Sequence, residues 1–307
     1  FRGATPLQSQ ALAMRDADIL SAEPVGQSGA VRLRSRNRNA TALLQAYNAR
    51  FDVLYAEPNY VGHYLDLPND ASLGQQWGIR NTGQVISGVA GTAGADIKAT
   101  QAWDITEGSR GIVVGVVDSG VDYRHPDLAA NMWSAPTAFT VTINGETITC
   151  AAGTHGFSSR TRTCDPLDDY GHGTHVAGII GGAGNNGIGV AGVSRVANMM
   201  ALKMGALGTF TTMDVIANLD FVMQVKALFP SEADIRVLNA SWGQPFSRAL
   251  LQEIDLLNTQ GILFVAAAGN PATNNDLQPS YPATFDLPNI ISVAATDNRD
   301  ALAFFSQ

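Results

Sequence analysis

The sequence predicts an α/β fold, in which a parallel sheet is covered by helices on both faces over most of the chain. Apolar runs of strand length recur in five places, at 112–117, 196–202, 235–240, 261–267 and 290–295. Helix-like segments lie between them, at about 211–229 and 247–259. Near-continuous apolar strands that alternate with helices are typical of a parallel sheet buried on both faces. Because ligands of such sheets bind beyond the carboxyl ends of the strands, functional residues are expected there.

The first part of the chain differs from the rest, since it mixes charged residues with short apolar runs. Residues 30–34 alternate like a strand, and residues 39–46 begin like a helix that is capped by their first residue, an asparagine. Residues 53–61 are expected to form a second strand. We therefore predict a small α+β domain at residues 1–65 and the larger α/β domain at residues 66–307.

The composition indicates a globular protein. Of the 307 residues, 45% are hydrophobic and 15% are charged, so the chain can bury a sizeable core. The formal net charge of −8 argues against nucleic acid and against an anionic membrane surface as the main partner. No apolar run approaches the roughly 18 residues of a membrane span. A glycine-rich stretch at 181–184 follows a helix-like run instead of a strand, which excludes the context of a dinucleotide-binding loop.

A carboxylate follows the first apolar strand of the larger domain, in the segment Val116-Val117-Asp118-Ser119-Gly120. Asp118 is therefore expected at the carboxyl end of a strand, where an ionised side chain needs a partner. Such a carboxylate is suited to hold an imidazole in one tautomer and to stabilise its protonated form. Considered alone, an aspartate at a strand end is more often part of a turn or a helix cap.

A histidine lies between two glycines in a second segment, Gly171-His172-Gly173-Thr174-His175, and an apolar helix-like run follows it. The helix dipole disfavours a protonated imidazole at a helix start, so an anionic partner would help His172 to accept a proton. The flanking glycines let a substrate approach. Zinc binding by His172 and His175 is the alternative, but this pair supplies only two ligands.

An asparagine ends a run of small residues in a third segment, Ala266-Ala267-Ala268-Gly269-Asn270. The amide of Asn270 is a neutral donor that is suited to face a developing oxyanion. In isolation, an ordinary asparagine turn is the favoured interpretation of this segment. The three segments are much more specific jointly than singly.

In this order and on an alternating α/β chain, the three segments closely resemble the subtilase family, from about residue 66 to the end. The resemblance implies a secreted or extracytoplasmic serine endopeptidase that acts on polypeptide substrates through an Asp/His/Ser triad. It implies that Asp118 orients the base, that His172 is the general base and then the acid, and that Asn270 is an oxyanion-hole donor.

The resemblance also places the walls of the primary specificity pocket. They would be formed by Ser241, Trp242, Gly243, Ala267, Ala268 and Gly269. Trp242 stands where the family usually has a smaller apolar residue, and taken alone it would be an ordinary core residue. Pro271 and Ser280 flank the expected base of the pocket, where no acidic residue is seen. Neutral, apolar substrate residues are therefore expected in it.

The loop at 184–190 resembles the family's calcium loop, which implies a structural Ca²⁺. Carried over from the family, the oxygen ligands come from Asp70, Asp127, Ala183, Asn186, Ile188 and Val190. Side chains would supply three of these oxygens and backbone carbonyls the rest, and Ca²⁺ binds roughly six or more oxygens. One residue is inserted before Asn185 relative to some relatives, so the assignment of the Ala183 carbonyl as a ligand depends on how this insertion is aligned. The alternative is a simple Asn-Gly turn.

Residues 54–61 resemble the end of the family's inhibitory propeptide. The resemblance implies that residues 1–65 form a propeptide domain, which assists folding and acts as an intramolecular inhibitor. Its tail would occupy the active site, and the junction near 64–69 would be cut there. The alternative is an unrelated α+β appendage.

The family's nucleophile segment, Gly-Thr-Ser, does not occur in the 307 residues. We interpret the sequence as truncated at its C-terminus, with the catalytic serine beyond Gln307, and we expect this chain alone to be inactive. The competing hypothesis is a non-catalytic binding or scaffold protein derived from a subtilase. A Gly-Thr-Ser in the continuing reading frame would distinguish the two.

The chain has two cysteines, Cys150 and Cys164, both in a polar insertion at 134–165. They are too few to define a disulfide scaffold or a zinc site. In a secreted protein a disulfide between them is expected. Two free thiols are the alternative.

Overall fold

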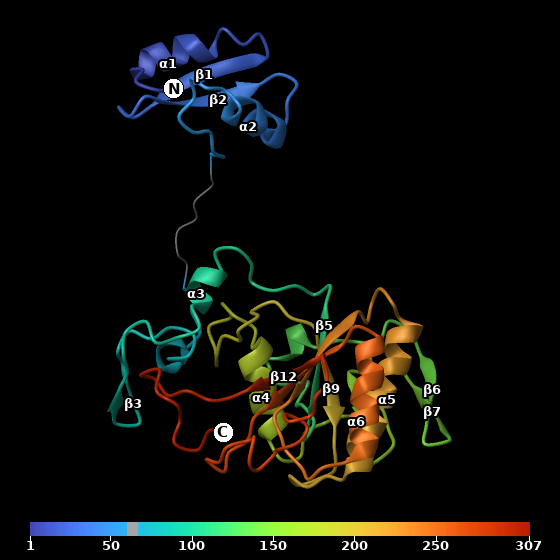
Figure 1. The fold of residues 1–307 in the computed structure, drawn as a ribbon. Coiled ribbons are helices and arrows are strands. Elements are labelled where there is room, and N and C mark those ends of the chain that lie inside the picture. The colour runs from blue at the N-terminus through green and yellow to red at the C-terminus, as the bar shows by residue number, and fades with distance from the viewer. Residues whose placement is uncertain (60–66) are drawn as a thin grey trace. The chain divides into compact units, whose positions relative to one another are not determined.

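The computed structural model describes residues 1–59 and 67–307. The chain divides into two compact units, Phe1–Tyr64 and Leu65–Gln307 (Figure 1). Each unit has its own hydrophobic core. The predicted domain boundary and the first part of the expected cleavage junction at 64–69 lie outside the described residues. Within the described ranges, no helix has both the length and the apolar character that a membrane span requires.

The first unit contains two helices and a two-stranded antiparallel sheet: α1 Pro6–Ala13, β1 Ile19–Val25, β2 Ala30–Ser35 and α2 Ala40–Asn48. The predictions of β2 and α2 are confirmed, and Asn39 caps α2 by accepting a hydrogen bond from the Ala42 N–H. The prediction omits α1, although Thr5 and Gln8 form a capping box around its start. The core of the unit comprises Ala13, Ile19, Ala22, Tyr47 and Val53.

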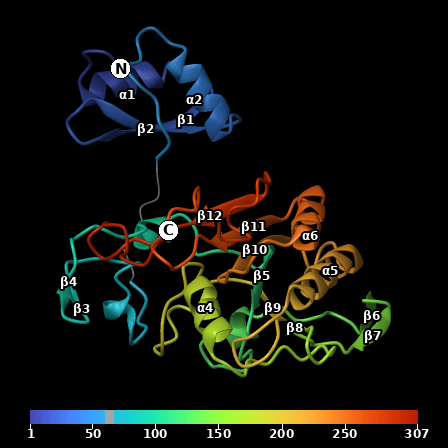
Figure 2. The same cartoon turned by 60° about the horizontal axis from the view of Figure 1, so that its bottom comes forward.

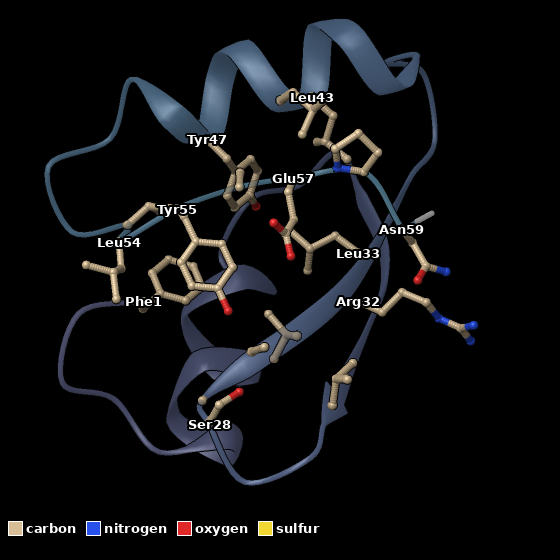
Figure 3. Close-up of a pocket in the computed structure, with 18 residues that line it drawn as sticks. Phe1, Ser28, Arg32, Leu33, Leu43, Tyr47, Leu54, Tyr55, Glu57 and Asn59 are labelled. Carbon is tan, nitrogen blue, oxygen red and sulfur yellow. The ribbon is translucent and has the colours of Figure 1, made fainter. Parts of the chain in front are cut away.

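The predicted strand at 53–61 is wrong for its described part, because residues 53–59 form no strand. Pro58 has no N–H to donate to a ladder. Asn48 holds the segment instead, since its side chain accepts from the Ala56 N–H at 2.8 Å and donates to the Ala56 carbonyl at 3.1 Å. A cavity of about 260 Å³ lies beside this segment, and its lining includes Leu33, Tyr47, Tyr55 and Glu57 (Figure 3).

The second unit is built on a six-stranded parallel sheet with the strand order β12-β11-β10-β5-β9-β8. Its strands are β5 Val113–Asp118, β8 Gly156–Ser158, β9 Met199–Lys203, β10 Ile235–Ala240, β11 Leu263–Ala267 and β12 Ile290–Val293. The five predicted strands are therefore confirmed, with ends displaced by a few residues. The prediction omits β8, which is too short to show a periodic pattern.

Helices cover both faces of this sheet, as predicted (Figures 1 and 2). The main ones are α4 His172–Gly181, α5 Thr212–Leu228 and α6 Arg248–Thr259. Neighbouring residues of one strand belong to different cores: Val117 of β5 packs in the cluster that contains α5 and α6, and Val116 packs in the cluster that contains α4. This alternation follows from the period of two along a strand. Shorter elements are η1 Leu73–Gln75, β3 Val85–Ile86, β4 Val89–Ala90, α3 Ala99–Ala102 and η2 Ala129–Asn131.

The polar insertion at 134–165 is not a simple loop, because it contains a β-hairpin of β6 Phe139–Ile143 and β7 Glu146–Cys150. Its turn is Asn144-Gly145, where both residues have positive φ, as a two-residue hairpin turn requires. Alternate residues of β6 are buried in the hydrophobic cluster that also contains residues of α5, and the residues between them are exposed threonines. A disulfide joins Cys150 to Cys164, whose Cα atoms are 5.5 Å apart.

Candidate active site

Asp118 is the last residue of β5, and its side chain is buried. The sheet therefore places its carboxylate at the carboxyl edge, as the sequence predicts. The Ser119 N–H donates to Oδ1 at 2.7 Å, and the backbone carbonyl of Asp118 accepts from the Met204 N–H. The other carboxylate oxygen, Oδ2, is buried and has no hydrogen-bond partner among the described residues. The negative charge is thus poorly solvated and available to a neighbouring cation.

His172 is the first residue of α4, and its Nδ1 lies 2.7 Å from Asp118 Oδ1, across 54 residues of sequence. The imidazole is 48% exposed, whereas the Asp118 side chain is 4% exposed. With Asp118 ionised, Nδ1 carries the proton that it donates, and Nε2 is left with a lone pair. The arrangement is therefore able to accept a proton at Nε2 and to stabilise the imidazolium that results.

The helix that carries His172 approaches the Asp118 loop very closely. A Cβ added to Gly173 would clash with the carbonyl oxygen of Gly120 and lie 3.0 Å from the Cβ of Asp118. Gly171 has φ +97°, a left-handed conformation that a side chain would strain. The two glycines around His172 are thus needed to bring the imidazole to the carboxylate, in addition to any access that they give a substrate.

Asp168 is a polar residue to which the sequence analysis gives no role, and it is hydrogen-bonded to both sides of this pair. Its carboxylate accepts from the hydroxyl of Ser119 and from groups of the segment that carries His172. Burial raises the pKa of Asp168, but hydrogen bonds from Thr174, Gly171 and Tyr170 outweigh it, so the pKa lies below its usual value. The spacing from Asp168 to Thr174 across a glycine-rich helix start is the sequence signal that marks it.

A cleft of about 180 Å³ lies beside the pair. Its lining comprises Asp118, Ser119, Tyr170, His172, Met204, Gly208, Phe210, Ser241 and Trp242. The structure therefore brings two of the predicted substrate-binding residues, Ser241 and Trp242, to the same cleft as Asp118 and His172. The indole N–H of Trp242 donates to the Val117 carbonyl at 2.8 Å, and its ring packs edge-on against Phe210. Trp242 thus belongs both to the cleft and to the core.

The other predicted wall residues follow two adjacent strands. Ala240 of β10 pairs with Ala266 of β11, so the segments after them leave the sheet side by side. A Cβ on Gly243 would lie 3.1 Å from the Ser280 hydroxyl, and one on Gly269 would lie 3.3 Å from it. Both glycines thus lie near the neutral Ser280 hydroxyl, and the side-chain amide of Gln307 lies closer still to Gly269.

Asn270, the predicted oxyanion-hole donor, lies outside the lining of this cleft. It lies in a bend just after β11, and its side chain is exposed. Ala267, Ala268, Gly243 and Gly269 are likewise outside that lining. The glycine-lined region near Ser280 is therefore not part of the lining of the cleft that contains His172.

The residues of the predicted calcium site come together around the loop at 184–190. Asp127 is buried, and its two carboxylate oxygens accept from the Asn186 amide and the Val190 N–H. Asp70 is also buried, and its Oδ2 accepts from the Asn185 N–H at 2.7 Å. Its Oδ1 is buried with no partner among the described residues. Buried charges in proteins are paired or coordinate metals, so a cation is a suitable partner for this carboxylate oxygen.

Metal ligation by acidic, histidine or cysteine side chains alone finds little support. In the part of the chain that the structure describes, no three of these side chains gather in a way that could hold a metal ion. His175, the second ligand of the zinc alternative, is exposed, and His172 faces Asp118. A cation near Asp70 and Asp127 would therefore depend on amide and backbone oxygens for most of its ligands.

Comparison with known proteins gives three kinds of match. The model of the subtilase family matches residues 109–307. A thermophilic serine proteinase of Bacillus sp. strain AK1 is 31% identical over 271 residues, which cover 87% of this chain and 55% of that protein. The minor extracellular protease Epr of Bacillus subtilis strain 168 is 29% identical over 212 residues, or 68% of this chain and 27% of Epr. The chain therefore spans about half the length of the first relative and about a quarter of the second.

Among solved structures, the crystal structure of a cold adapted subtilisin-like serine proteinase aligns with 75% of this chain and 67% of its own, with a TM-score of 0.49 and 24% identity.

Proposed function

The chain belongs to the subtilase family, and from this premise we propose that it supplies the base and its orienting carboxylate to a serine endopeptidase that is made as a precursor. The observation that carries the proposal is the 2.7 Å contact between His172 Nδ1 and Asp118 Oδ1 beside a cleft at the carboxyl edge of a parallel sheet. A buried carboxylate on one ring nitrogen and an exposed second nitrogen are what a general base needs.

In the proposed reaction, His172 takes the proton of a serine hydroxyl at Nε2 as the oxygen attacks the peptide carbonyl. Asp118 keeps the Nδ1–H in place and stabilises the imidazolium, which then protonates the leaving amine. Asn270 would donate its amide N–H to the oxyanion. No Gly-Thr-Ser occurs in the 307 residues, so we place the serine in sequence that follows Gln307.

A chain expressed from the reading frame continued beyond Gln307 tests this function. It is expected to hydrolyse casein and to lose activity on treatment with phenylmethylsulfonyl fluoride. Mass spectrometry of the inhibited protein is expected to find the label on a serine of a Gly-Thr-Ser segment. Hydrolysis that resists this reagent, or a label on one of the residues 1–307, would contradict the proposed mechanism.

We propose neutral, apolar residues at the substrate position that precedes the cleaved bond. Gly243 and Gly269 lie near the Ser280 hydroxyl, and the atoms nearest to either glycine among the described residues include no carboxylate that could pair with a basic side chain. An unpaired buried charge is costly. We expect kcat/KM for peptides with Phe or Leu at this position to exceed that for matched peptides with Arg or Lys by at least about tenfold. Strict cleavage after basic residues would overturn this proposal.

We propose a structural Ca²⁺ held by Asp70 and Asp127 with Asn186, and with carbonyls of Ala183, Ile188 and Val190. The unpartnered Asp70 Oδ1 supports a cation there. The ion would fasten the segment after residue 67 to the loop that follows α4.

Thermal unfolding tests the calcium proposal. Ca²⁺ at a hundred times its Kd stabilises a protein by about 2.7 kcal/mol, which corresponds to roughly 5–10 °C for a unit of this size. EGTA is therefore expected to lower the Tm by that amount, and Asp70→Asn to abolish the response. Asp104→Asn, at an exposed aspartate, is the matched control and should keep the response. A Tm that is unaffected by EGTA and by added calcium would refute the site.

We propose that residues 1–65 are the propeptide domain of this precursor and act on the enzyme as an intramolecular inhibitor. The resemblance of residues 54–61 to a propeptide end supports this, and the described residues 53–59 form no helix or strand and lie outside the β1–β2 ladder. We also propose an extracytoplasmic location. The Cys150–Cys164 disulfide suits an oxidising compartment, since such bonds are rare in the cytosol.

A further inference from the structure

The start of helix α4 is capped from outside the helix. Its N-cap residue, Gly171, has no side chain to satisfy the free N–H groups of the first turn. The Gly173 N–H instead donates to the Ser119 hydroxyl at 2.9 Å, and the Thr174 N–H donates to Asp168 Oδ2 at 3.0 Å. The first of these acceptors is the residue after Asp118. The helix that begins at His172 is thus fastened directly to the loop of its carboxylate partner.

One carboxylate joins these caps into a single network. Asp168 Oδ1 accepts from the Ser119 hydroxyl and from the N–H groups of Tyr170 and Gly171, at 2.9–3.0 Å. Its Oδ2 accepts from the N–H and the hydroxyl of Thr174, at 3.0 and 2.6 Å. Asp168 therefore receives five hydrogen bonds, and the donors lie on both sides of His172 and next to Asp118.

A second connection runs from the far side of the same helix turn. The Thr174 hydroxyl, while donating to Asp168, accepts from the Asp122 N–H at 2.9 Å. The loop after β5 is therefore held to α4 through Ser119 and again through Asp122. With Gly120 and Gly173 in close approach between them, the loop and the helix start have little freedom to shift relative to one another.

We propose that Asp168 is a positioning residue for the Asp118–His172 pair, acting through Ser119 and Thr174 without touching the substrate. This inference rests on the proposed function of the pair. The hydrogen bonds to Asp168 order the segment that carries His172. The glycines on either side of His172 have no side chains that could hold this segment in place. A misplacement of about 1 Å is enough to lower a rate by roughly 10²-fold.

Asp214 provides a matched control, because it is a capping carboxylate of similar chemistry elsewhere in the same unit. Asp214 lies in the first turn of α5. Its carboxylate accepts hydrogen bonds from the Thr211 N–H, the Thr211 hydroxyl and the Ser159 hydroxyl. None of these donors belongs to the segments of Asp118 or His172. Loss of Asp214 should therefore destabilise the fold without altering the geometry of the pair.

The first measurement uses the 307-residue chain labelled with ¹⁵N-histidine. In the parent chain, the Nδ1-bound proton of His172 is expected as a low-field NMR resonance that is missing from the His172→Ala variant. Asp168→Ala is expected to broaden or remove this resonance, and Ser119→Ala to do so partly. Asp214→Ala should leave it unchanged. Ser119→Ala also serves if the larger change prevents folding.

The second measurement uses the enzyme expressed from the continued reading frame. Asp168→Ala is expected to lower kcat by about 10²-fold with little change in KM, and Asp214→Ala to stay within about twofold. A folded Asp168→Ala protein with the parent resonance and the parent kcat would overturn the inference. Absence of the resonance from the parent chain itself would instead refute the Asp118–His172 pair, and with it the proposed function.

Discussion

The 307-residue chain is expected to hydrolyse casein and fluorogenic peptides no faster than its own His172→Ala variant. It contains the proposed base, His172, and the carboxylate proposed to orient it, Asp118, but no Gly-Thr-Ser from which an acyl intermediate could form. In subtilisin, loss of the serine alone lowers kcat by about 2 × 10⁶ and leaves roughly 10³–10⁴ over water. The backbone donor of the nucleophile is absent here as well, so the loss should be larger still.

The comparison of the two proteins decides this prediction. Both are assayed at equal soluble concentration, because exposed apolar residues such as Ile291, Val293 and Phe304 favour aggregation. Turnover of the 307-residue chain above that of its His172→Ala variant would mean that another residue acts as nucleophile. Activity that arises only when the C-terminal continuation is supplied would support the reaction proposed here.

Replacing Asp118 by Asn in the enzyme with the continued reading frame is expected to lower kcat by about 10⁴-fold. An asparagine keeps the size of the side chain, but it carries no charge to stabilise the imidazolium. Its amide N–H can also face Nδ1, which moves the imidazole proton to Nε2, where the base must accept one. The effect should fall on kcat, since Asp118 is buried and is proposed to act through its contact with His172.

Asp122→Asn is the control for this substitution. It makes the same chemical change four residues further along, at a side chain that is 43% exposed and pairs with Arg124. Its kcat is expected to stay within about threefold of the parent, because surface ion pairs contribute little. A kcat of Asp118→Asn close to that of the control would show that some other group orients His172.

The strands and the principal helices of the larger unit could be predicted from the sequence because they are buried. A strand with both sides covered is apolar throughout, so β5 and β9 stand out as continuous runs. Where a strand is covered on one side only, the signal is weaker. The β6–β7 hairpin has buried Phe139, Val141 and Ile143 between exposed threonines, and its composition resembles that of a polar loop.

The segment at 53–61 shows the opposite failure. Its apolar residues predict a strand, but a strand forms only where a partner edge accepts its hydrogen bonds. In the described residues 53–59, Asn48 of α2 takes the backbone groups of Ala56 instead. Local pattern is thus overridden by the neighbours that the fold provides.

What the sequence by itself determined is the chemical identity of the candidate site residues. Asp118 at the end of a buried strand and His172 at the start of an apolar helix are local features that a short stretch of sequence shows. Only the tertiary structure decided that they meet, because they are 54 positions apart with the hairpin insertion between them, and the parallel sheet sets which strand ends are adjacent. The same holds for Ser119, which caps α4 from 54 positions away and donates to Asp168 from 49 positions away. Hydrogen bonds between segments distant in sequence depend on the packing that brings them together, and no local pattern records it.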